Sequence, residues 1–354
     1  MRKIAKRILP LSLHTSSQDI ADLKAMLKDD SLSREDREYV RQTLQKVQKK
    51  ENEQKVLKVR VVGVTCLASC FPCLNGFSFP IIILDECSQI TEPLSCLSIA
   101  RFHCNKLILV GDPKQLPPTI TAVDHASSFK NLEFTLFERL LACGYEKIFL
   151  KTQYRCHPEI SRLASDLFYD SQVVSGISSA ERVPLLEELP CLLFVDVEAN
   201  QEIRDPTGSY KNLKEAHVIS EALKRLVVFG LSTAEIGVIS LYKSQSRCIQ
   251  EIYGESCQQP VMISTVDAFQ GGEREVILLS TVRISSDYTF LENERRVNVA
   301  LTRAKRHLLI FGSLKHLQKN KLWAKIINYC EKKKFVRKSD FLFKTAEAES
   351  SADL

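Results

Sequence analysis

Apolar residues are grouped in two different ways along this chain. Between residues 19 and 55 they recur at helical spacing in a charged segment, at Ile20, Leu23 and Leu27 and then at Val40, Leu44 and Val47. We therefore expect two helices here. Ser33 followed by Asp36 is typical of a helix cap and predicts where the second helix begins.

After residue 55 the apolar residues form short continuous runs separated by segments with a helical pattern. Such runs predict strands that are buried on both faces, as in a parallel sheet covered by helices, so the expected fold class is α/β. The runs are 59–64, 81–84, 107–110, 148–150, 192–195, 236–239, 261–263, 276–280 and 308–311. The end of the chain, 331–354, is rich in Lys and then in Ala, Glu and Ser, and we expect it to be a disordered tail.

Length and composition restrict the possibilities further. The chain has 354 residues, 44% of them hydrophobic, which suggests about two domains. A net charge of +6 permits a polyanionic partner without demanding one. The sequence shows no signal peptide pattern and no apolar stretch of membrane-spanning length, so we expect no membrane association and a cytosolic or nuclear protein. The twelve cysteines lie mostly in apolar segments and are interpreted as free thiols.

Polar side chains stand beside the predicted strands, where a parallel sheet places its ligands. Asp85 and Glu86 follow one apolar run, and Gly111 and Asp112 follow the next. A strand that ends in Asp-Glu suits phosphoryl transfer with a divalent metal: Asp85 would orient Mg²⁺, and Glu86 would accept a proton from the attacking water. Either acid alone is weak evidence, because acidic residues commonly cap helices at such positions.

Amide and guanidinium groups complete this chemistry. Gln115, which follows Asp112, offers both a donor and an acceptor to a terminal phosphate or its attacking water. Arg155 and Arg303 could neutralise the transferred phosphoryl oxygens, since the planar guanidinium fits phosphate with two hydrogen bonds. Taken by itself, each arginine is more often an ordinary solvated side chain.

Five motifs then resemble, in order and separation, motifs II to VI of the superfamily 1 helicases in their senataxin-like branch. They read DECSQ, GDPKQLPP, QYRCHPEI, STVDAFQGGERE and NVALTRAKRHLLIFG, and the resemblance covers residues 56–330. The stretch from STVDAFQGG to the segment after NVALTRAK is most similar to DNA helicases that carry a GRF-type zinc finger elsewhere in the chain. The resemblance implies an ATP hydrolase with ATP and Mg²⁺ as cofactors.

Residue roles follow from the resemblance position by position. Asp85 and Glu86 match the Walker B pair, with Asp85 on the metal, and Gln115 matches the γ-phosphate sensor beside Asp112. Tyr154 matches the aromatic residue placed against adenine; Arg155 and Arg303 match the two arginines at the γ-phosphate. Gly272 and Glu273 match the ribose contact. Four hydroxyl residues match positions that touch the nucleic-acid backbone: Thr65, Ser69, Ser264 and Thr265.

The resemblance also implies a domain organisation. It predicts two RecA-like parallel-sheet domains, the first incomplete, with a boundary near residue 150 and ATP between them. Residues 1–16 would be a remnant of the first domain, 17–55 a helical stalk, 56–150 the C-terminal part of the first domain and 151–330 the second domain. Hydrolysis would then move the protein along one strand of DNA in the 5′ to 3′ direction.

One family feature is missing from this sequence. No glycine is followed by lysine, so no loop ending in Gly-Lys-Ser/Thr can cradle the β- and γ-phosphates. We therefore expect an N-terminally truncated chain that is inactive alone. The preferred hypothesis is the motor portion of a nuclear DNA helicase of repair or replication, acting on single-stranded or branched DNA. An RNA helicase of the same branch and a non-hydrolysing nucleic-acid-binding or regulatory module remain alternatives.

Overall fold

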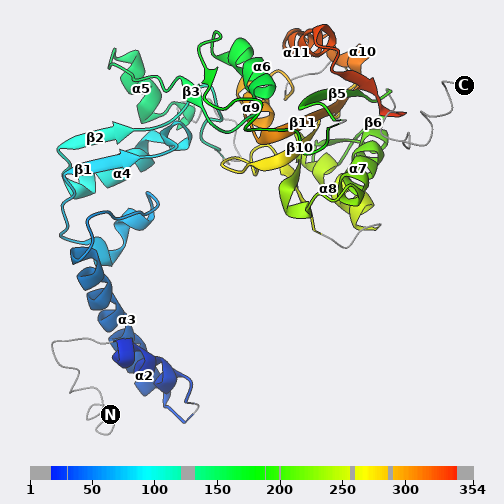
Figure 1. Ribbon diagram of the computed structural model, residues 1–354. Coiled ribbons are helices and arrows are strands. Elements are labelled where there is room, and N and C mark those ends of the chain that lie inside the picture. The colour runs from blue at the N-terminus through cyan, green and yellow to red at the C-terminus, as the bar shows by residue number, and fades with distance from the viewer. Residues whose placement is uncertain are drawn as a thin grey trace, which may run out of the picture. The chain divides into compact units, whose positions relative to one another are not determined.

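The computed structural model describes residues 17–29, 31–120, 132–187, 189–198, 201–255, 260–285 and 290–340, and the chain divides into two compact units (Figure 1). The first comprises Met1–Gly111 and Pro118–Cys143, and the second comprises Asp112–Pro117 and Gly144–Leu354. The division thus falls at residue 143, against the predicted 150. It also assigns the short segment 112–117 to the second unit, because Leu116 is buried in that unit's core.

Two helices form the stalk that the sequence predicts for residues 17–55. Helix α2 spans Ser17–Leu27 and α3 spans Arg34–Leu57. The hydroxyl of Ser33 accepts a hydrogen bond from the backbone N–H of Asp36 at 3.1 Å, which confirms the predicted helix cap. The two helices pack through a small apolar cluster centred on Leu23, Val40 and Val47.

The sheet of the first unit has two strands among the described residues. Strands β1 (Ile81–Leu84) and β2 (Lys106–Leu109) pair in parallel, in register from Ile81 with Lys106 to Leu84 with Leu109. The remaining elements are η1 (Ala68–Cys70), η2 (Pro72–Leu74), η3 (Cys87–Gln89), α4 (Glu92–Phe102) and α5 (Leu136–Ala142). Alternate residues of β1 are buried, at Ile82 and Leu84, while Ile83 is 62% exposed. This sheet is therefore covered on one face, and the expectation that both faces of its strands are buried is wrong.

The second unit contains a six-stranded parallel sheet in the order β12-β5-β11-β10-β8-β9. Its strands are β5 (Leu192–Asp196), β8 (Ile236–Ser240), β9 (Met262–Thr265), β10 (Arg274–Ser280), β11 (Ala304–Gly312) and β12 (Val336–Lys338). Two smaller pairs accompany it, β3 (Thr152–Gln153) with β4 (Val174–Ser175) and β6 (Glu202–Arg204) with β7 (Tyr210–Asn212). All strands of the large sheet run in the same direction, as the continuous apolar runs predict.

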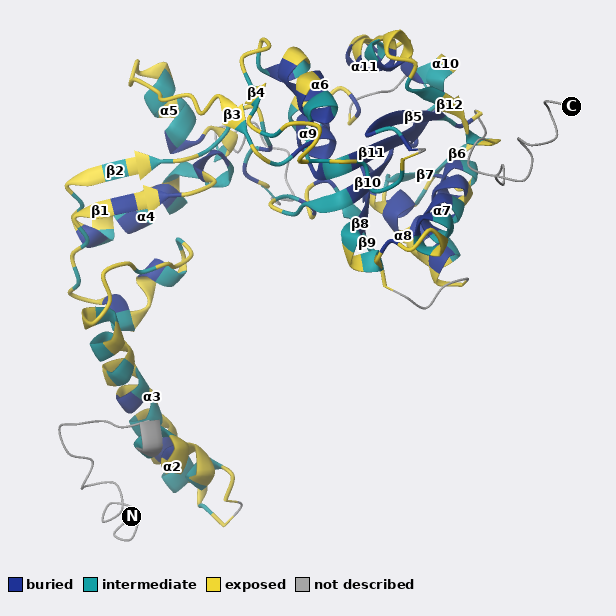
Figure 2. Cartoon of the chain, in the orientation of Figure 1, coloured by how far each residue is buried: buried dark blue, intermediate teal, exposed yellow. Residues whose placement is uncertain are grey.

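Helices cover both faces of this large sheet, so its strands are the most deeply buried part of the second unit (Figure 2). Alternate residues of β5 enter separate cores: Leu192 and Phe194 face one, Leu193 and Val195 the other. Helices α6 (Pro158–Phe168), α9 (Glu294–Leu301) and α11 (Lys321–Lys332) contribute to the first core. Helices α7 (Leu213–Val228) and α8 (Lys243–Gly254) contribute to the second, and α10 (Leu314–Leu317) is a single turn after β11. This three-layer arrangement confirms the predicted α/β class.

Three expectations about elements are wrong. Residues 59–64 and 148–150 form no strand, and Ile148 and Leu150 are largely exposed, because no neighbouring strand pairs with either run. Residues 331–340 are not a disordered tail: α11 ends at Lys332, and β12 pairs with β5 from Val336 onward. The rest of that predicted tail, 341–354, and the predicted remnant 1–16 lie outside the described residues.

Among the described helices, none combines the length and apolar content that a membrane crossing requires.

Candidate functional site in the second unit

The predicted ligand residues of the second unit lie at two opposite edges of the large sheet. Glu273 directly precedes β10 and Arg303 directly precedes β11, and the backbone N–H of Arg274 bonds the carbonyl of Arg303 at 3.1 Å. Thr265 is the last residue of β9, so it lies at the carboxyl edge. Thr265 therefore lies at the carboxyl end of its strand, as expected, whereas Glu273 and Arg303 lie at the amino edge of the sheet.

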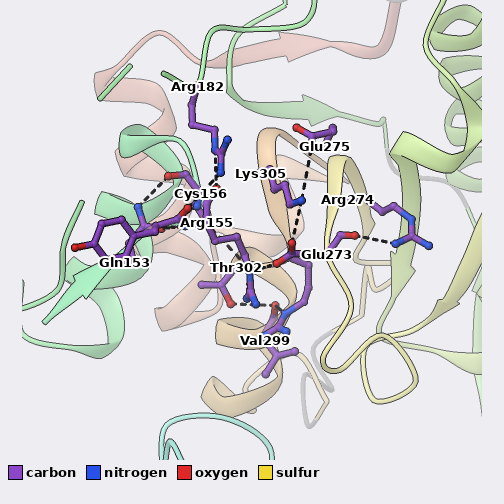
Figure 3. A network of polar contacts seen from close by, with 12 residues as sticks. Gln153, Arg155, Cys156, Arg182, Glu273, Arg274, Glu275, Val299, Thr302 and Lys305 are labelled. Carbon is purple, nitrogen blue, oxygen red and sulfur yellow. Dashed lines mark hydrogen bonds and ion pairs between the residues drawn. The ribbon is translucent and has the colours of Figure 1, made fainter. Parts of the chain in front are cut away.

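Arg155 lies at the centre of a polar network at the amino edge (Figure 3). Its Nε donates to Glu273 Oε2 at 2.7 Å, and its Nη1 donates to the carbonyl of Thr302 at 3.3 Å. Its backbone is fixed as well: the N–H donates to Gln153 Oε1 at 2.8 Å, and the carbonyl accepts from Arg182 Nε at 3.1 Å. The guanidinium is thus held against the start of β10 by a rigidly placed backbone.

Glu273 is held by two cations. Lys305 Nζ contacts Glu273 Oε1 at 2.9 Å, in addition to the bond from Arg155. Its hydrogen bond with Lys305 is the main reason that the pKa of Glu273 lies below its ordinary value, and Arg155 adds to the effect. The chain reaches this position through Gly271, whose φ of +75° favours glycine, and through Gly272, whose N–H bonds the carbonyl of Phe269.

Arg303 is almost wholly buried, with 3% of its surface exposed. Its Nη2 donates to Gln115 Oε1 at 3.1 Å, and its Nε donates to the carbonyl of Val299 at 3.0 Å. The Nε2 of Gln115 donates in turn to Asp112 Oδ2 at 3.0 Å. A buried guanidinium with an amide beside it can offer positive charge and hydrogen-bond donors to phosphoryl oxygens.

Tyr169 and Asn298 attach the segment 112–117 to the second unit. The hydroxyl of Tyr169 donates to Asp112 Oδ2 at 2.6 Å, and Asn298 Nδ2 donates to that hydroxyl at 2.7 Å and to the carbonyl of Lys114 at 2.8 Å. Burial, with the nearby charge of Asp112, raises the pKa of Tyr169, so the hydroxyl stays protonated and remains a donor. These bonds place Gln115 beside Arg303.

Tyr154 presents a free aromatic surface. Its side chain packs against Gly176, where a Cβ atom would lie 2.4 Å from Tyr154 Cε1, and the residue is nevertheless 67% exposed. The carbonyl of Tyr154 accepts from Arg182 Nη2 at 3.2 Å, which fixes the backbone. An exposed ring supported from behind is suited to stacking on a planar base.

Asp85 and Glu86 belong to the first unit, where they follow β1. The backbone N–H of Glu86 bonds Asp85 Oδ1 at 2.9 Å, and Gln89 Nε2 donates to Glu86 Oε2 at 2.7 Å. Both acids are exposed, and Glu86 has a left-handed φ of 51°. Within the described residues, no group of three or more acidic, His or Cys side chains could hold a metal. A Mg²⁺ ion at Asp85 would therefore need phosphate oxygens and water as its other ligands, which is its usual preference.

The four predicted nucleic-acid residues differ in accessibility. Thr65 is exposed and its hydroxyl accepts from the N–H of Ala68 at 3.1 Å. Ser69 is buried and its hydroxyl donates to the carbonyl of Cys66 at 2.5 Å, so it stabilises the turn that presents Thr65. In the second unit, Ser264 and Thr265 are partly exposed at the end of β9.

Comparison with known proteins identifies the family. Two models described as "AAA domain" match residues 10–123 and 132–315. The 5′-3′ DNA helicase ZGRF1 of Mus musculus is 48% identical over 94% of this chain and 18% of its own length. Regulator of nonsense transcripts 1 homolog of Neurospora crassa is 35% identical over 77% of this chain and 26% of its own length. DNA polymerase alpha-associated DNA helicase A of Saccharomyces cerevisiae is 34% identical over 73% of this chain and 42% of its own length.

The chain belongs to the superfamily 1 helicases. It spans less than half the length of each of these relatives. The five motifs quoted from the sequence occur in the order that this family shows. The α/β fold agrees with this assignment.

The structure brings several of the predicted site residues close together. Arg155 bonds Glu273 and the carbonyl of Thr302, the residue before Arg303. Arg303 bonds Gln115, which in turn bonds Asp112. Asp85 and Glu86 lie in the other unit and are described there by themselves. Binding of ATP, Mg²⁺ or nucleic acid by these residues stays a prediction.

Three residues of this polar network were not singled out from the sequence: Lys305, Tyr169 and Asn298. Lys305 stands two residues after Arg303 in the motif TRAK, a position that could have drawn attention. Tyr169 follows α6, and Asn298 faces it from α9. No local pattern marks either of them, because their partners in the segment 112–117 are distant in sequence.

Proposed function

We propose that this chain is the motor portion of an ATP-dependent 5′-3′ DNA helicase acting in DNA repair or replication in the nucleus. The observation that carries the proposal is the hydrogen bond between Arg303 and Gln115, which joins a buried guanidinium to the amide expected at the γ-phosphate. Burying a guanidinium costs desolvation free energy, and the attraction of a phosphoryl group to the cation would offset that cost.

The proposed hydrolysis assigns acids to one unit and guanidinium groups to the other. Asp85 would orient Mg²⁺, and Glu86 would accept the proton of the water that attacks the γ-phosphorus as the bond to ADP breaks. Gln115 would position that water, while Arg155 and Arg303 neutralise the phosphoryl oxygens. Further contacts would hold the nucleoside: Tyr154 against adenine, and Gly272 with Glu273 at the ribose.

The polynucleotide would be held through its backbone. Thr265, with Ser264, lies at the sheet edge opposite Glu273, so strand and nucleotide would occupy separate edges of the second unit. Hydroxyl contacts to phosphate grip a strand without reading its bases. We favour single-stranded or branched DNA because the mouse relative is named a DNA helicase; an RNA helicase of the same branch is the alternative.

Fluorescence polarisation with labelled single strands of DNA and RNA, with and without ATP and Mg²⁺, tests the proposal. We expect strand affinity to change when nucleotide is added, and Arg303→Met to abolish that change. Arg225→Met is the matched control, because Arg225 lies on α7, which covers the other face of the sheet. Strand binding that is indifferent to ATP would instead favour a binding module without turnover, and no strand binding at all would refute both functions.

A further inference from the structure

The two carboxylate oxygens of Glu273 have different partners. Oε1 lies 2.9 Å from Lys305 Nζ, and Oε2 accepts from Arg155 Nε at 2.7 Å (Figure 3). The side chain is 39% exposed, so a ligand can approach it from solvent. Under the proposed function, Glu273 contacts the ribose and Arg155 contacts the γ-phosphate. The structure shows these two residues paired with each other.

Lys305 lies near a second carboxylate as well as Glu273. Its Nζ also lies 3.6 Å from Glu275 Oε1, and Glu275 is held by Arg306 Nε at 3.0 Å. Lys305, on β11, therefore stands between two carboxylates at the start of β10, whereas the guanidinium of Arg155 has Glu273 as its ion-pair partner and also bonds the carbonyl of Thr302. If Arg155 moved away, Lys305 would keep Glu273 ionised and oriented, because Lys305 is the main cause of its lowered pKa.

A ribose hydroxyl needs an acceptor, and Oε2 of Glu273 is the oxygen that Arg155 occupies. A terminal phosphate attracts the guanidinium with two charge-assisted hydrogen bonds and thereby vacates Oε2. A diphosphate lacks that phosphoryl group and leaves the pair between Arg155 and Glu273 in place.

We propose that Arg155 and the ribose compete for Oε2 of Glu273, so that recognition of the ribose is coupled to engagement of Arg155 by the γ-phosphate. Lys305 is the positioning residue that keeps Glu273 in place during the exchange. The inference rests on the proposed function and adds a regulation to it: triphosphate and ribose are recognised together. By linkage, each contact strengthens the other by the same factor.

The coupling predicts a sugar preference that depends on the number of phosphates. Hydrogen bonds to charged groups contribute about 1.5–3 kcal/mol, or roughly tenfold or more in affinity. We expect roughly that preference for ribose over 2′,3′-dideoxyribose in a non-hydrolysable ATP analogue with an imido group between its β- and γ-phosphates. For ADP the ribose must first displace Arg155, so we expect less than about threefold.

The experiment measures dissociation constants of the four nucleotides, at up to millimolar concentration with Mg²⁺, by NMR titration of the chain. In Arg155→Met the oxygen is vacant throughout, so the ribose preference should be equally high for diphosphate and triphosphate. Lys305→Met should lower the preference for the triphosphate, and Lys305→Arg should restore it. Arg306→Met is the matched control, because Arg306 pairs with Glu275 and not with Glu273. Trp323 fluorescence confirms that each variant is folded.

The outcomes separate the inference from the proposed function. Equal ribose preference for ADP and the triphosphate in the unaltered chain would overturn the coupling, even if Glu273→Gln abolishes the preference in both. A preference unchanged by Glu273→Gln would refute the ribose contact and with it the coupling. Absence of binding for every nucleotide would refute the nucleotide site itself.

Discussion

The carboxyl group of Glu215, on α7, is almost wholly buried at the carboxyl end of β10. Its Oε1 accepts from the Ser280 hydroxyl at 2.5 Å and from the N–H of Val282 at 3.0 Å. Val282 has a φ of 72°, a conformation that a β-branched residue adopts at a cost, so these bonds stabilise a strained turn. Burial is the main cause that raises the pKa of Glu215 to about 7.

This raised pKa makes the stability of the second unit depend on pH. Between the unfolded value of 4.5 and about 7, the folded state keeps a proton that the unfolded state loses. Stability is therefore highest below that window, falls as pH rises through it and levels off above about 7; the full loss is about 3 kcal/mol. We expect Glu215→Gln, which does not titrate, to abolish this fall. Denaturant unfolding at several pH values, followed by Trp323 fluorescence, measures this dependence, and the exposed Glu251→Gln is the control. If Glu215→Gln kept the pH dependence of the unaltered chain, the assignment to Glu215 would be refuted.

Tyr169 offers a second test at the scale of one atom. Tyr169→Phe removes the hydroxyl that bonds Asp112 and Asn298 and leaves the ring in place. We expect a loss of about 1–2 kcal/mol in local stability, which is roughly five- to thirtyfold faster amide exchange in 112–117. Hydrogen-exchange mass spectrometry measures this rate. Tyr39→Phe, at an exposed position of α3, should change nothing, and unchanged exchange in Tyr169→Phe would show that other contacts hold the segment.

Single residues could be predicted where their chemistry is marked by neighbours in sequence. Arg155, Glu273 and Gln115 stand in motifs, and the structure places them in one network with Arg303. The pairing of Arg155 with Glu273 could not be predicted, because it depends on how the segment between β3 and α6 packs against the start of β10, 118 positions away in sequence. Asn298 has the same limitation: its bond to the Lys114 carbonyl spans 184 positions of sequence.

At the scale of elements, apolar runs located the strands of the second unit but could not decide pairing. The runs 192–195, 236–239 and 308–311 became β5, β8 and β11 because each found neighbours within one sheet. The runs 59–64 and 148–150 were also predicted to be strands, but they form none. Composition misled at the other end of the chain: the Lys-rich 331–340 supplies β12, whose two exposed residues of three gave no apolar pattern.

Strand β12 provides a test of this correction. The carbonyl of Phe335 accepts from the N–H of Phe194 at 2.8 Å, and β12 continues along β5 to Lys338. We expect a chain ending after Lys332 to lose about 2–4 kcal/mol in the second unit, because β5 becomes an edge strand and Phe335 no longer covers the core. A chain ending after Asp340 keeps all these contacts and is the control. Equal thermal unfolding midpoints for the two chains, followed by Trp323 fluorescence, would contradict the role of β12.

At the scale of the whole molecule, the two units differ in how well they bury their apolar residues. The strands of the second unit are covered on both faces, whereas β1 and β2 expose Ile81, Ile83 and Ile108. A parallel sheet is normally covered on both faces, so this exposed apolar face is a liability for the isolated chain. The proposed chemistry needs acids from this less well buried unit as well as arginines from the other.

Phosphate binding by the whole chain can also be tested. No glycine precedes a lysine anywhere in the 354 residues, so this sequence has no Gly-Lys-Ser/Thr motif. We expect the purified chain to bind nucleotide weakly and to show no ATP hydrolysis stimulated by single strands. Phosphate release measured with and without DNA checks this, with Glu86→Gln as the matched variant. Stimulated hydrolysis by the unaltered chain that Glu86→Gln abolishes would contradict the prediction, since the remaining groups would then suffice for catalysis without the cradle.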